Sequence, residues 1–332
     1  MTTVRESLNE ALVACLQESP EVCFLGEDIL DPYGGAFKVA DGLSTQFSNR
    51  VITTPVSEAG IVGVGIGMAL RGLRPVVEIM FGDFITLAAD QLINHAAKIR
   101  WMSGDAARIP LVVRTPMGGG RGYGPTHSQS LEKHFLGAAG LRVVAVSSVD
   151  DPGGLLHRAV LEDDDPVLFV EHKLLYPDTL LPLDGGGDFD IVRGSNGYPD
   201  YQLQLHGSPK PSLTLVAYGY MAELAREAMR SLAYEKEVFC ELIVPTQISP
   251  FKLESLYASA AQTKRVLVIE EGSQTMGWGA EVSARLHETI PSVIKVGRIG
   301  ALEMPIPAAI QLEAAILPSV EKIKNMAVKL VA

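Results

Sequence analysis

The sequence lacks most of the features that hold metals, nucleotides or disulfide-bonded scaffolds. Its only cysteines, Cys15, Cys23 and Cys240, form no Cys-x-x-Cys pair and have no histidine cluster beside them. This argues against a zinc site or a disulfide framework and favours reduced thiols in a cytoplasmic protein. Neither Gly-x-Gly-x-x-Gly nor the phosphate-loop pattern ending in Gly-Lys-Ser/Thr occurs, so the usual nucleotide fingerprints are missing.

Long apolar runs and excess positive charge are missing as well. The most apolar stretch, Ile61–Leu70, lies between Glu58 and Arg71 and is too short to span a bilayer. The first residues form neither a basic region nor a cleavable apolar segment, so we expect no secretion or anchoring. The net charge of −11 disfavours nucleic acids and anionic membranes as partners.

What remains is the pattern of an α/β protein with two doubly wound domains. A chain of 332 residues that is 47% hydrophobic has room for two packed cores. The capping box of Thr3 and Glu6 opens the first helix. Short apolar runs then alternate with helical patterns, which predicts parallel sheets covered on both faces. In the first half, the expected strands are Val22–Leu25, Val51–Thr54, Val76–Met80, Leu111–Arg114, Val143–Val146 and Val167–Val170, and the expected helices are Ser57–Arg71, Ile85–Met102, Leu131–Ala139 and Pro152–Glu162.

The alternation stops in a segment rich in glycine and proline and then begins again. We therefore divide the chain into a first domain (1–176), a linker (177–212) and a smaller second domain (213–332). In the second domain, the expected strands are Leu213–Tyr218, Val238–Val244, Val266–Ile269 and Val293–Val296, and the expected helices are Met221–Tyr234, Pro250–Ala261, Ala280–Thr289 and a C-terminal helical tail.

A carboxylate stands where such sheets bind ligands. In the segment Thr54-Pro-Val-Ser-Glu-Ala-Gly60, Ser57 is a candidate N-cap and Glu58 falls in the first helical turn, beyond the carboxyl end of a strand. The alternative is a Glu favoured there by the helix dipole. The helix also contains Gly60, Gly63, Gly65 and Gly67, which favours close approach of a partner chain's equivalent helix over packing on the domain's own sheet.

Two further segments end strands with residues suited to binding or proton transfer. Phe81 and Phe84 follow a predicted strand and form either a ring-stacking platform or part of the core. His127 ends a glycine-rich loop (118–126), where it is a better acid or base than the other histidines. Those in or beside regular elements, which we interpret as structural, are His95, His157, His172 and His287.

Together these motifs resemble a known family over residues 4–332. The chain is similar to the β subunit of the two-chain, thiamin-diphosphate-dependent decarboxylase component of 2-oxo acid dehydrogenases (pyruvate, branched-chain and acetoin types), in the transketolase superfamily. The resemblance implies a pyrimidine-binding domain followed by a transketolase C-terminal domain. The motifs that carry it are Gly26-Glu-Asp, Tyr33-Gly-Gly-Ala-Phe-Lys38, Thr54-Pro-Val-Ser-Glu-Ala-Gly60, Gly72-Leu-Arg-Pro-Val-Val-Glu78, Phe84, Asp90-Gln91, Ala96-Ala-Lys98, His127-Ser-Gln-Ser-Leu-Glu132 and Pro305-Ile-Pro307.

The resemblance implies roles for matching residues. Glu58 would hydrogen-bond the aminopyrimidine ring nitrogen opposite the amino group, which drives the ring to the imino form that deprotonates the thiazolium carbon. Such a Glu should be desolvated, because burial favours the protonated carboxyl. Phe84, with Phe81 beside it, would bind the pyrimidine, His127 would face the substrate, and Glu27 would relay protons between paired sites.

The resemblance also implies what other chains and ions supply. Some members bind a structural K⁺ through backbone carbonyls, and the matching positions are Leu111 and Asp163 to Asp165, where this sequence has one extra residue. One-chain members hold Mg²⁺ and the diphosphate through Gly-Asp-Gly and Asn-Asn, and both motifs are absent here. We therefore expect an α subunit that holds Mg²⁺ and the diphosphate, in the α₂β₂ tetramer that the resemblance implies. Docking onto a lipoyl acyltransferase core stays open, because residues 184–211 are longer and richer in glycine than in the family.

Other functions stay open at this point. A carboligase subunit would keep the same residues but pass the carbanion to an aldehyde instead of lipoamide. A non-catalytic assembly subunit would keep the fold, although the intact Glu58 argues against it. A nicotinamide dehydrogenase is disfavoured by the missing dinucleotide fingerprint.

Overall fold

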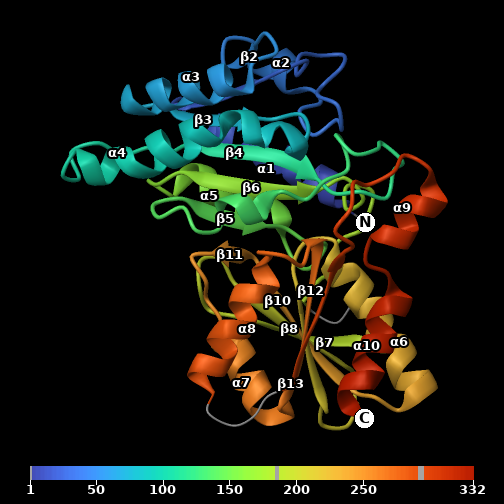
Figure 1. The fold of residues 1–332 in the computed structure, drawn as a ribbon. Helices are drawn as coiled ribbons and strands as arrows, with labels where there is room; N and C mark the ends of the chain where they lie inside the picture. The colour runs from blue at the N-terminus through green and yellow to red at the C-terminus, as the bar shows by residue number, and fades with distance from the viewer. Residues whose placement is uncertain (1, 184–186, 291–294) are drawn as a thin grey trace. The chain divides into compact units, whose positions relative to one another are not determined.

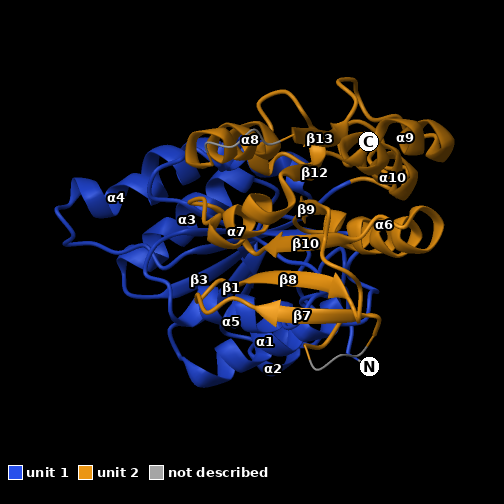
Figure 2. Ribbon diagram, turned by 90° about the horizontal axis from the view of Figure 1, so that it is seen from below, with its two compact units in different colours: residues 1–118, 134–180 blue, residues 119–133, 181–332 orange. Residues whose placement is uncertain are grey.

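The computed structural model describes residues 2–183, 187–290 and 295–332 and divides the chain into two compact units. Unit 1 comprises residues 1–118 and 134–180, and unit 2 comprises residues 119–133 and 181–332. Figure 1 shows the course of the chain, and Figure 2 colours the two units separately. Both units are α/β structures with largely parallel sheets, which confirms the predicted fold class. The glycine-rich segment 119–133, expected in the first domain, belongs to unit 2.

Unit 1 contains a parallel sheet with the strand order β5-β6-β4-β3-β1-β2. Its strands are β1 (Val22–Gly26), β2 (Val51–Thr53), β3 (Arg74–Glu78), β4 (Val112–Met117), β5 (Arg142–Ala145) and β6 (Val167–His172). Strands β1, β4 and β6 are buried along their whole length, as expected for a sheet covered on both faces. Because the strands are parallel, their carboxyl ends share one edge of the sheet.

Helices cover both faces of this sheet. The helices of unit 1 are α1 (Val4–Glu18), α2 (Leu43–Gln46), α3 (Glu58–Leu70), α4 (Ala97–Met102) and α5 (Pro152–Leu161). The predicted capping box opens α1, where Thr3 Oγ1 accepts the Glu6 amide and the Glu6 carboxylate accepts the Thr3 amide. On β3, the Arg74 side chain reaches the Val160 carbonyl of α5, whereas Val77 lies under Gly65 of α3. Side chains three residues apart on a strand point to opposite faces, so α3 and α5 lie on opposite sides.

Two predicted helices of unit 1 differ in the structure. The stretch 85–102 is a 3₁₀ helix (Gly82–Ala88), a π-helix (Gln91–Ala96) and then α4. The buried positions of this stretch recur every three or four residues, which fits all of these helix types, so periodicity could not separate them. The stretch 131–139 contains only a 3₁₀ turn, Glu132–Phe135. Gly137 and Gly140 follow it, and glycine is a poor helix former.

Unit 2 contains a six-stranded sheet in the order β13-β12-β9-β10-β8-β7. Its strands are β7 (Phe189–Arg193), β8 (Asp200–Leu205), β9 (Leu213–Ala217), β10 (Cys240–Pro245), β12 (Arg265–Ser273) and β13 (Lys295–Ala301), and β11 (Gln247–Ser249) is not part of it. Its helices are α6 (Met221–Lys236), α7 (Glu254–Thr263), α8 (Trp278–Thr289), α9 (Ile310–Ile316) and α10 (Val320–Val331). Helices α7 and α8 cover one face of the sheet, and α6 and α10 cover the other (Figure 1). Part of the predicted strand Val293–Val296 lies outside the described residues.

The expectation of a linker over 177–212 needs correction. Strands β7 and β8 fall inside this segment and pair antiparallel, and β8 also pairs antiparallel with β10. Tyr201 and Leu203 of β8 are fully buried and alternate with more exposed residues. This short period-two signal is the sequence pattern of a strand, but the surrounding glycines and prolines concealed it.

A buried arginine ties three elements of unit 1 together. Arg114 on β4 donates to the carboxylates of Glu78 on β3 and Glu171 on β6, with 2.8 Å from Nε to Glu171 Oε1. The side chains of Arg114, Glu78 and Glu171 are at most 6% exposed. The Tyr176 hydroxyl also donates to Glu171 at 2.7 Å. Burial raises the pKa of Glu78, and the charge of Glu171 raises it further, whereas the Arg114 guanidinium opposes the shift.

This network predicts a large loss of stability for Arg114→Met, because the change leaves two carboxylates buried without their cation. We expect the free energy of unfolding to fall by about 3–5 kcal/mol, measured by chemical denaturation. Arg108→Met is the control, since Arg108 forms an exposed pair with Asp164 and such pairs contribute about 1 kcal/mol or less. Equal small losses in both variants would contradict the importance of the network.

Candidate active site

The structure places Glu58 at the first residue of α3, just beyond β2 in unit 1. Its side chain is buried, with 7% of the residue exposed. Ser57 occupies the predicted N-cap position, but its side chain makes no capping hydrogen bond. A carboxyl group is thus held at the sheet edge where parallel α/β folds bind ligands.

A second buried carboxyl group, Glu27, lies near Glu58. Glu27 follows β1, which pairs with β2, and only 8% of the residue is exposed. Burial raises the pKa of Glu27, and the charge of Glu58 raises it further, whereas a hydrogen bond from the Ser57 amide opposes the shift. Among the residues that the structure describes, none forms a hydrogen bond with the buried Oε1 of Glu27. The structure therefore brings together the two carboxylates that the sequence analysis named separately.

The two predicted aromatic residues differ in their surroundings. The rings of Phe81 and Phe84 meet edge to face, with centroids 6.3 Å apart. Phe81 also meets the ring of Phe37 at 5.5 Å, and Lys173 Nζ lies 5.2 Å from its centroid. Phe81 is therefore largely committed to packing in unit 1, and Phe84 is the better candidate for a ligand-stacking ring.

His127 belongs to unit 2, with the glycine-rich loop that precedes it. Its Nδ1 lies 3.0 Å from Thr126 Oγ1, and its amide donates to the Gly124 carbonyl at 3.3 Å. Its side chain is neither buried nor fully exposed, so a substrate can reach the ring. The structure thus places His127 in one unit and Glu27, Glu58 and the two phenylalanines in the other.

The positions expected to bind K⁺ already have hydrogen-bond or ion-pair partners. The Leu111 carbonyl accepts from the Val167 amide at 2.9 Å, and the Asp163 carbonyl accepts from Arg74 Nη2 at 2.5 Å. Both carboxylate oxygens of Asp165 lie 2.9 Å from Nη1 of Arg100. Within the described residues, no group of three His, Cys, Asp or Glu side chains could hold a metal ion. A cation beside the Arg74 guanidinium would be repelled by its charge, so these positions fit a K⁺ ion poorly.

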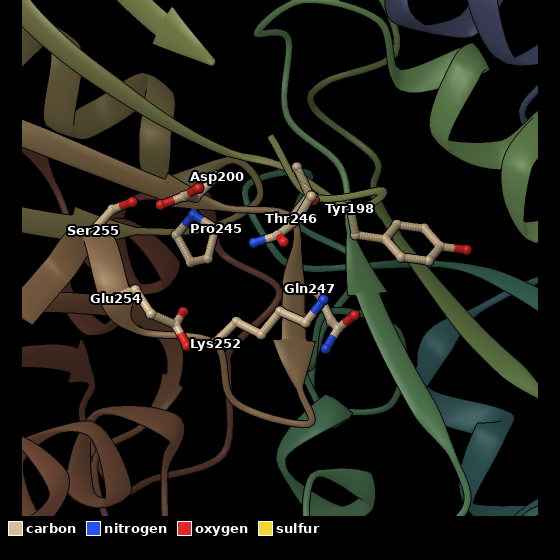
Figure 3. A pocket seen from close by; sticks show the side chains of 9 residues that line it. Tyr198, Asp200, Pro245, Thr246, Gln247, Lys252, Glu254 and Ser255 are labelled. Atoms are coloured by element: carbon tan, nitrogen blue, oxygen red, sulfur yellow. The ribbon is translucent and has the colours of Figure 1, made fainter. Parts of the chain in front are cut away.

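Two pockets lie away from the predicted catalytic residues. One in unit 2 has a volume of about 30 Å³, enough for water. It is lined by Tyr198, Asp200 and Lys252, among other polar residues (Figure 3). A depression of about 440 Å³ in unit 1 lies against Trp101, which is 85% exposed. Neither contains Glu58 or His127.

The sequence alone gave no role to a set of acids that the structure buries in unit 2. These are Glu132, Glu270, Glu271 and Glu313, each less than 9% exposed. The Tyr218 hydroxyl donates to Glu132 at 2.7 Å, and the Gly279 amide donates to Glu270 at 3.0 Å. Burial, reinforced by the charge of Glu132, raises the pKa of Glu270 to about 7. The run Glu270-Glu271 at the end of an apolar strand was the available signal, since charged residues seldom continue a buried strand without partners.

Comparison with known protein families matches both halves of the chain. Residues 1–179 match the transketolase pyrimidine binding domain, and residues 204–323 match the transketolase C-terminal domain. No helix in the described part of the chain is both long and apolar enough to cross a membrane.

Relatives of known function share about a third of their residues with this chain. The pyruvate dehydrogenase E1 component subunit beta-1 of Oryza sativa is 35% identical, covering 98% of this chain and 85% of the relative. The 2-oxoisovalerate dehydrogenase subunit beta of Pseudomonas aeruginosa is 37% identical, covering 86% and 82%. The acetoin:2,6-dichlorophenolindophenol oxidoreductase subunit beta of Cupriavidus necator is 32% identical, covering 98% and 96%.

A solved structure supports the fold independently. A split-gene transketolase, described as an inactive β₄ tetramer, superposes with a TM-score of 0.74, covering 100% of this chain and 99% of that one. The two sequences are 20% identical, so this likeness concerns the fold alone.

The raised pKa of Glu270 predicts a specific dependence of stability on pH. The pKa of Glu270 rises from 4.5 to about 7 on folding. Between pH 4.5 and 7, the folded state therefore keeps a proton on Glu270 that the unfolded chain has already released. The free energy of unfolding should therefore fall as the pH rises from 4.5 to 7. Glu270→Gln has no titrating group at this position. From pH 4.5 to 7, the free energy of unfolding of the variant should therefore rise by up to about 3 kcal/mol relative to that of the parent, as measured by denaturation at several pH values. Parallel pH profiles for parent and variant would contradict the assignment, and Glu288→Gln, at an exposed position, is the control.

Proposed function

The chain belongs to the family of β subunits of the thiamin-dependent E1 components of 2-oxo acid dehydrogenases, and on that premise we propose that it supplies the proton-handling residues for 2-oxo acid decarboxylation. The observation that carries the proposal is the pair of buried carboxyl groups, Glu58 and Glu27, at the carboxyl edge of the unit 1 sheet. Burial and the nearby charge of Glu58 both raise the pKa of Glu27, so a proton is held more readily at this position than on a carboxyl group in water.

The residues present fit the heterocyclic part of thiamin diphosphate. The buried Oε1 of Glu27 has no hydrogen-bond partner within the described part of the chain, and Phe84 follows β3, at the same edge of the sheet. When bound, the cofactor supplies the electron sink that decarboxylation of a 2-oxo acid requires. Glu58 would hold a proton on its carboxyl oxygen toward a ring nitrogen, Phe84 would support the ring face, and Glu27 would exchange the proton with Glu58. The relay of protons by Glu27 between two paired active sites is also part of the proposal.

His127 completes the set as a donor toward the substrate. Histidine is the side chain used most often for proton transfer in catalysis, and the ring of His127 is partly exposed, so a 2-oxo acid can reach it. The chain lacks Gly-Asp-Gly and Asn-Asn, so the residues for Mg²⁺ and the diphosphate would come from an α subunit in an α₂β₂ enzyme. Lipoamide on an acyltransferase core would be the acceptor, and product analysis with and without lipoamide would reveal carboligation instead. A cytoplasmic location stays a prediction.

We expect Glu58→Gln to abolish most decarboxylation, because the amide keeps the shape of the side chain but cannot exchange the proton. In enzyme reconstituted with the α subunit, kcat should fall roughly 10²- to 10⁴-fold. Glu10→Gln is the matched control, since Glu10 is exposed on α1. Undiminished decarboxylation by Glu58→Gln would reject the role of Glu58, and full activity of the α subunit alone would reduce this chain to an assembly subunit.

Because the residues for Mg²⁺ and the diphosphate would come from the α subunit, we expect the isolated chain to bind the cofactor poorly. Calorimetric titration of the isolated chain with thiamin diphosphate and Mg²⁺ should give a Kd weaker than about 1 mM. Addition of the α subunit should produce stoichiometric binding. Tight binding to the isolated chain would show that its own residues hold the diphosphate.

A further inference from the structure

The glycine-rich loop of unit 2 is fastened by acids that come from distant parts of the sequence. The Gly119 amide donates to Glu271 Oε1 at 2.6 Å. The amides of Gly120 and Gly122 donate to the two carboxylate oxygens of Glu313, at 2.9 and 2.8 Å. Three amides of the loop are therefore bound by two carboxylates that lie more than 150 positions away.

Glu313 fills an anion-binding concavity of the loop. Gly120 and Gly122 have φ angles of +83° and +69°, and this alternation turns their amides toward the same side. Such concavities in other proteins bind phosphate, but here a carboxylate of the same chain satisfies the amides. Glu313 is only 1% exposed, so water competes little for these hydrogen bonds.

The loop packs closely against the segment around α9. A β-carbon added at Gly122 would lie 2.9 Å from the Ala308 carbonyl oxygen, and the φ angle of Gly122 also disfavours any larger residue. The loop is thus fixed both by charge, through Glu313, and by close backbone contact, through Ala308.

The far end of the loop is fastened as well. Tyr218 donates to Glu132, and Lys133 Nζ donates to the Ser273 hydroxyl at 2.7 Å and the Thr275 carbonyl at 2.8 Å. His127 lies between these two anchored ends, and its own amide is bonded inside the loop to Gly124. The Glu313 anchor at Gly122 is only five residues before His127, so a shift there moves the backbone that carries the ring.

We propose that Glu313 is a positioning residue for His127, acting through the amides of Gly120 and Gly122. The inference rests on the proposed function, because it gives His127 its substrate-facing role. Glu313 itself does not meet the substrate or the cofactor. It holds the loop so that the imidazole is presented in one orientation, and a misplacement of about 1 Å at a reacting group can reduce a rate roughly 100-fold.

The first test compares Glu313→Gln with Glu288→Gln in the enzyme reconstituted with the α subunit. Glutamine turns its NH₂ group toward one of the two amides, so that hydrogen bond is lost. Amide hydrogen exchange of Gly120 and Gly122 should accelerate roughly tenfold or more in Glu313→Gln, and kcat should fall roughly 10- to 100-fold. The Kd for thiamin diphosphate should stay within about twofold, because Glu27, Glu58 and Phe84 are unchanged. Glu288→Gln, an exposed carboxylate-to-amide change in α8, should alter none of these quantities.

A double-mutant cycle separates positioning from a general structural effect. If Glu313 acts through His127, the double variant Glu313→Gln/His127→Ala should be no slower than His127→Ala alone, within about twofold. Additive losses in kcat would overturn the proposal, as would unchanged loop exchange in Glu313→Gln. Gly122→Ala disturbs the loop from the Ala308 side and should show the same non-additivity, which keeps the test available if Glu313→Gln folds poorly.

These experiments also distinguish a failure of the proposed function from a failure of the positioning role. Full activity of His127→Ala would remove the role of His127, whereas the exchange rates of Gly120 and Gly122 would still report whether Glu313 holds the loop. Normal His127 dependence with an unaffected Glu313→Gln enzyme would leave the proposed function intact and reject the positioning role.

Discussion

Carboxylates removed from water are the constraint on which this structure depends. A buried carboxylate must find a cation, backbone amides, hydroxyl groups or a proton, because an uncompensated charge is costly away from water. Unit 1 satisfies Glu78 and Glu171 mainly with the single guanidinium of Arg114. Within the described residues, Glu27 and Glu58 form no salt bridge with a cation, and burial raises the pKa of Glu27. The structural pair and the candidate catalytic pair are therefore distinguished by how their charge is balanced.

Unit 2 uses a different solution to the same problem. Its acids are satisfied by backbone amides and by the Tyr218 hydroxyl, while Glu270 keeps its proton to about pH 7. Amides come from loops and helix starts, so each of these bonds also fixes a piece of backbone. The glycines that give the loop its positive φ angles expose those amides, and the acids use them. The same hydrogen bonds therefore balance the buried charge and fix the shape of the loop. In this way Glu313 is linked to the segment that carries His127.

Several features of the fold and the candidate site could be predicted before the structure was known. Alternating apolar runs and helical patterns identified most strands and helices, since buried parallel strands leave continuous apolar segments. Glu58 could be named because it follows a strand, where parallel sheets bind ligands, whereas Glu27 was named only through the family resemblance. The hairpin of β7 and β8 was concealed by glycines and prolines around a two-residue alternation. The π-helix of residues 91–96 could not be recognised, because its buried positions also suit an α-helix.

The sequence by itself determined the fold class, the family, and the residue types at the ends of the strands, because these depend on local patterns of apolar, glycine and charged residues. Only the tertiary structure decided which charges meet. It placed the loop 119–133 in unit 2, brought Glu313 to the amides of Gly120 and Gly122, and set Arg114 between two carboxylates. Each of these contacts joins residues far apart in the chain, and no local pattern encodes which distant partner will satisfy a buried charge.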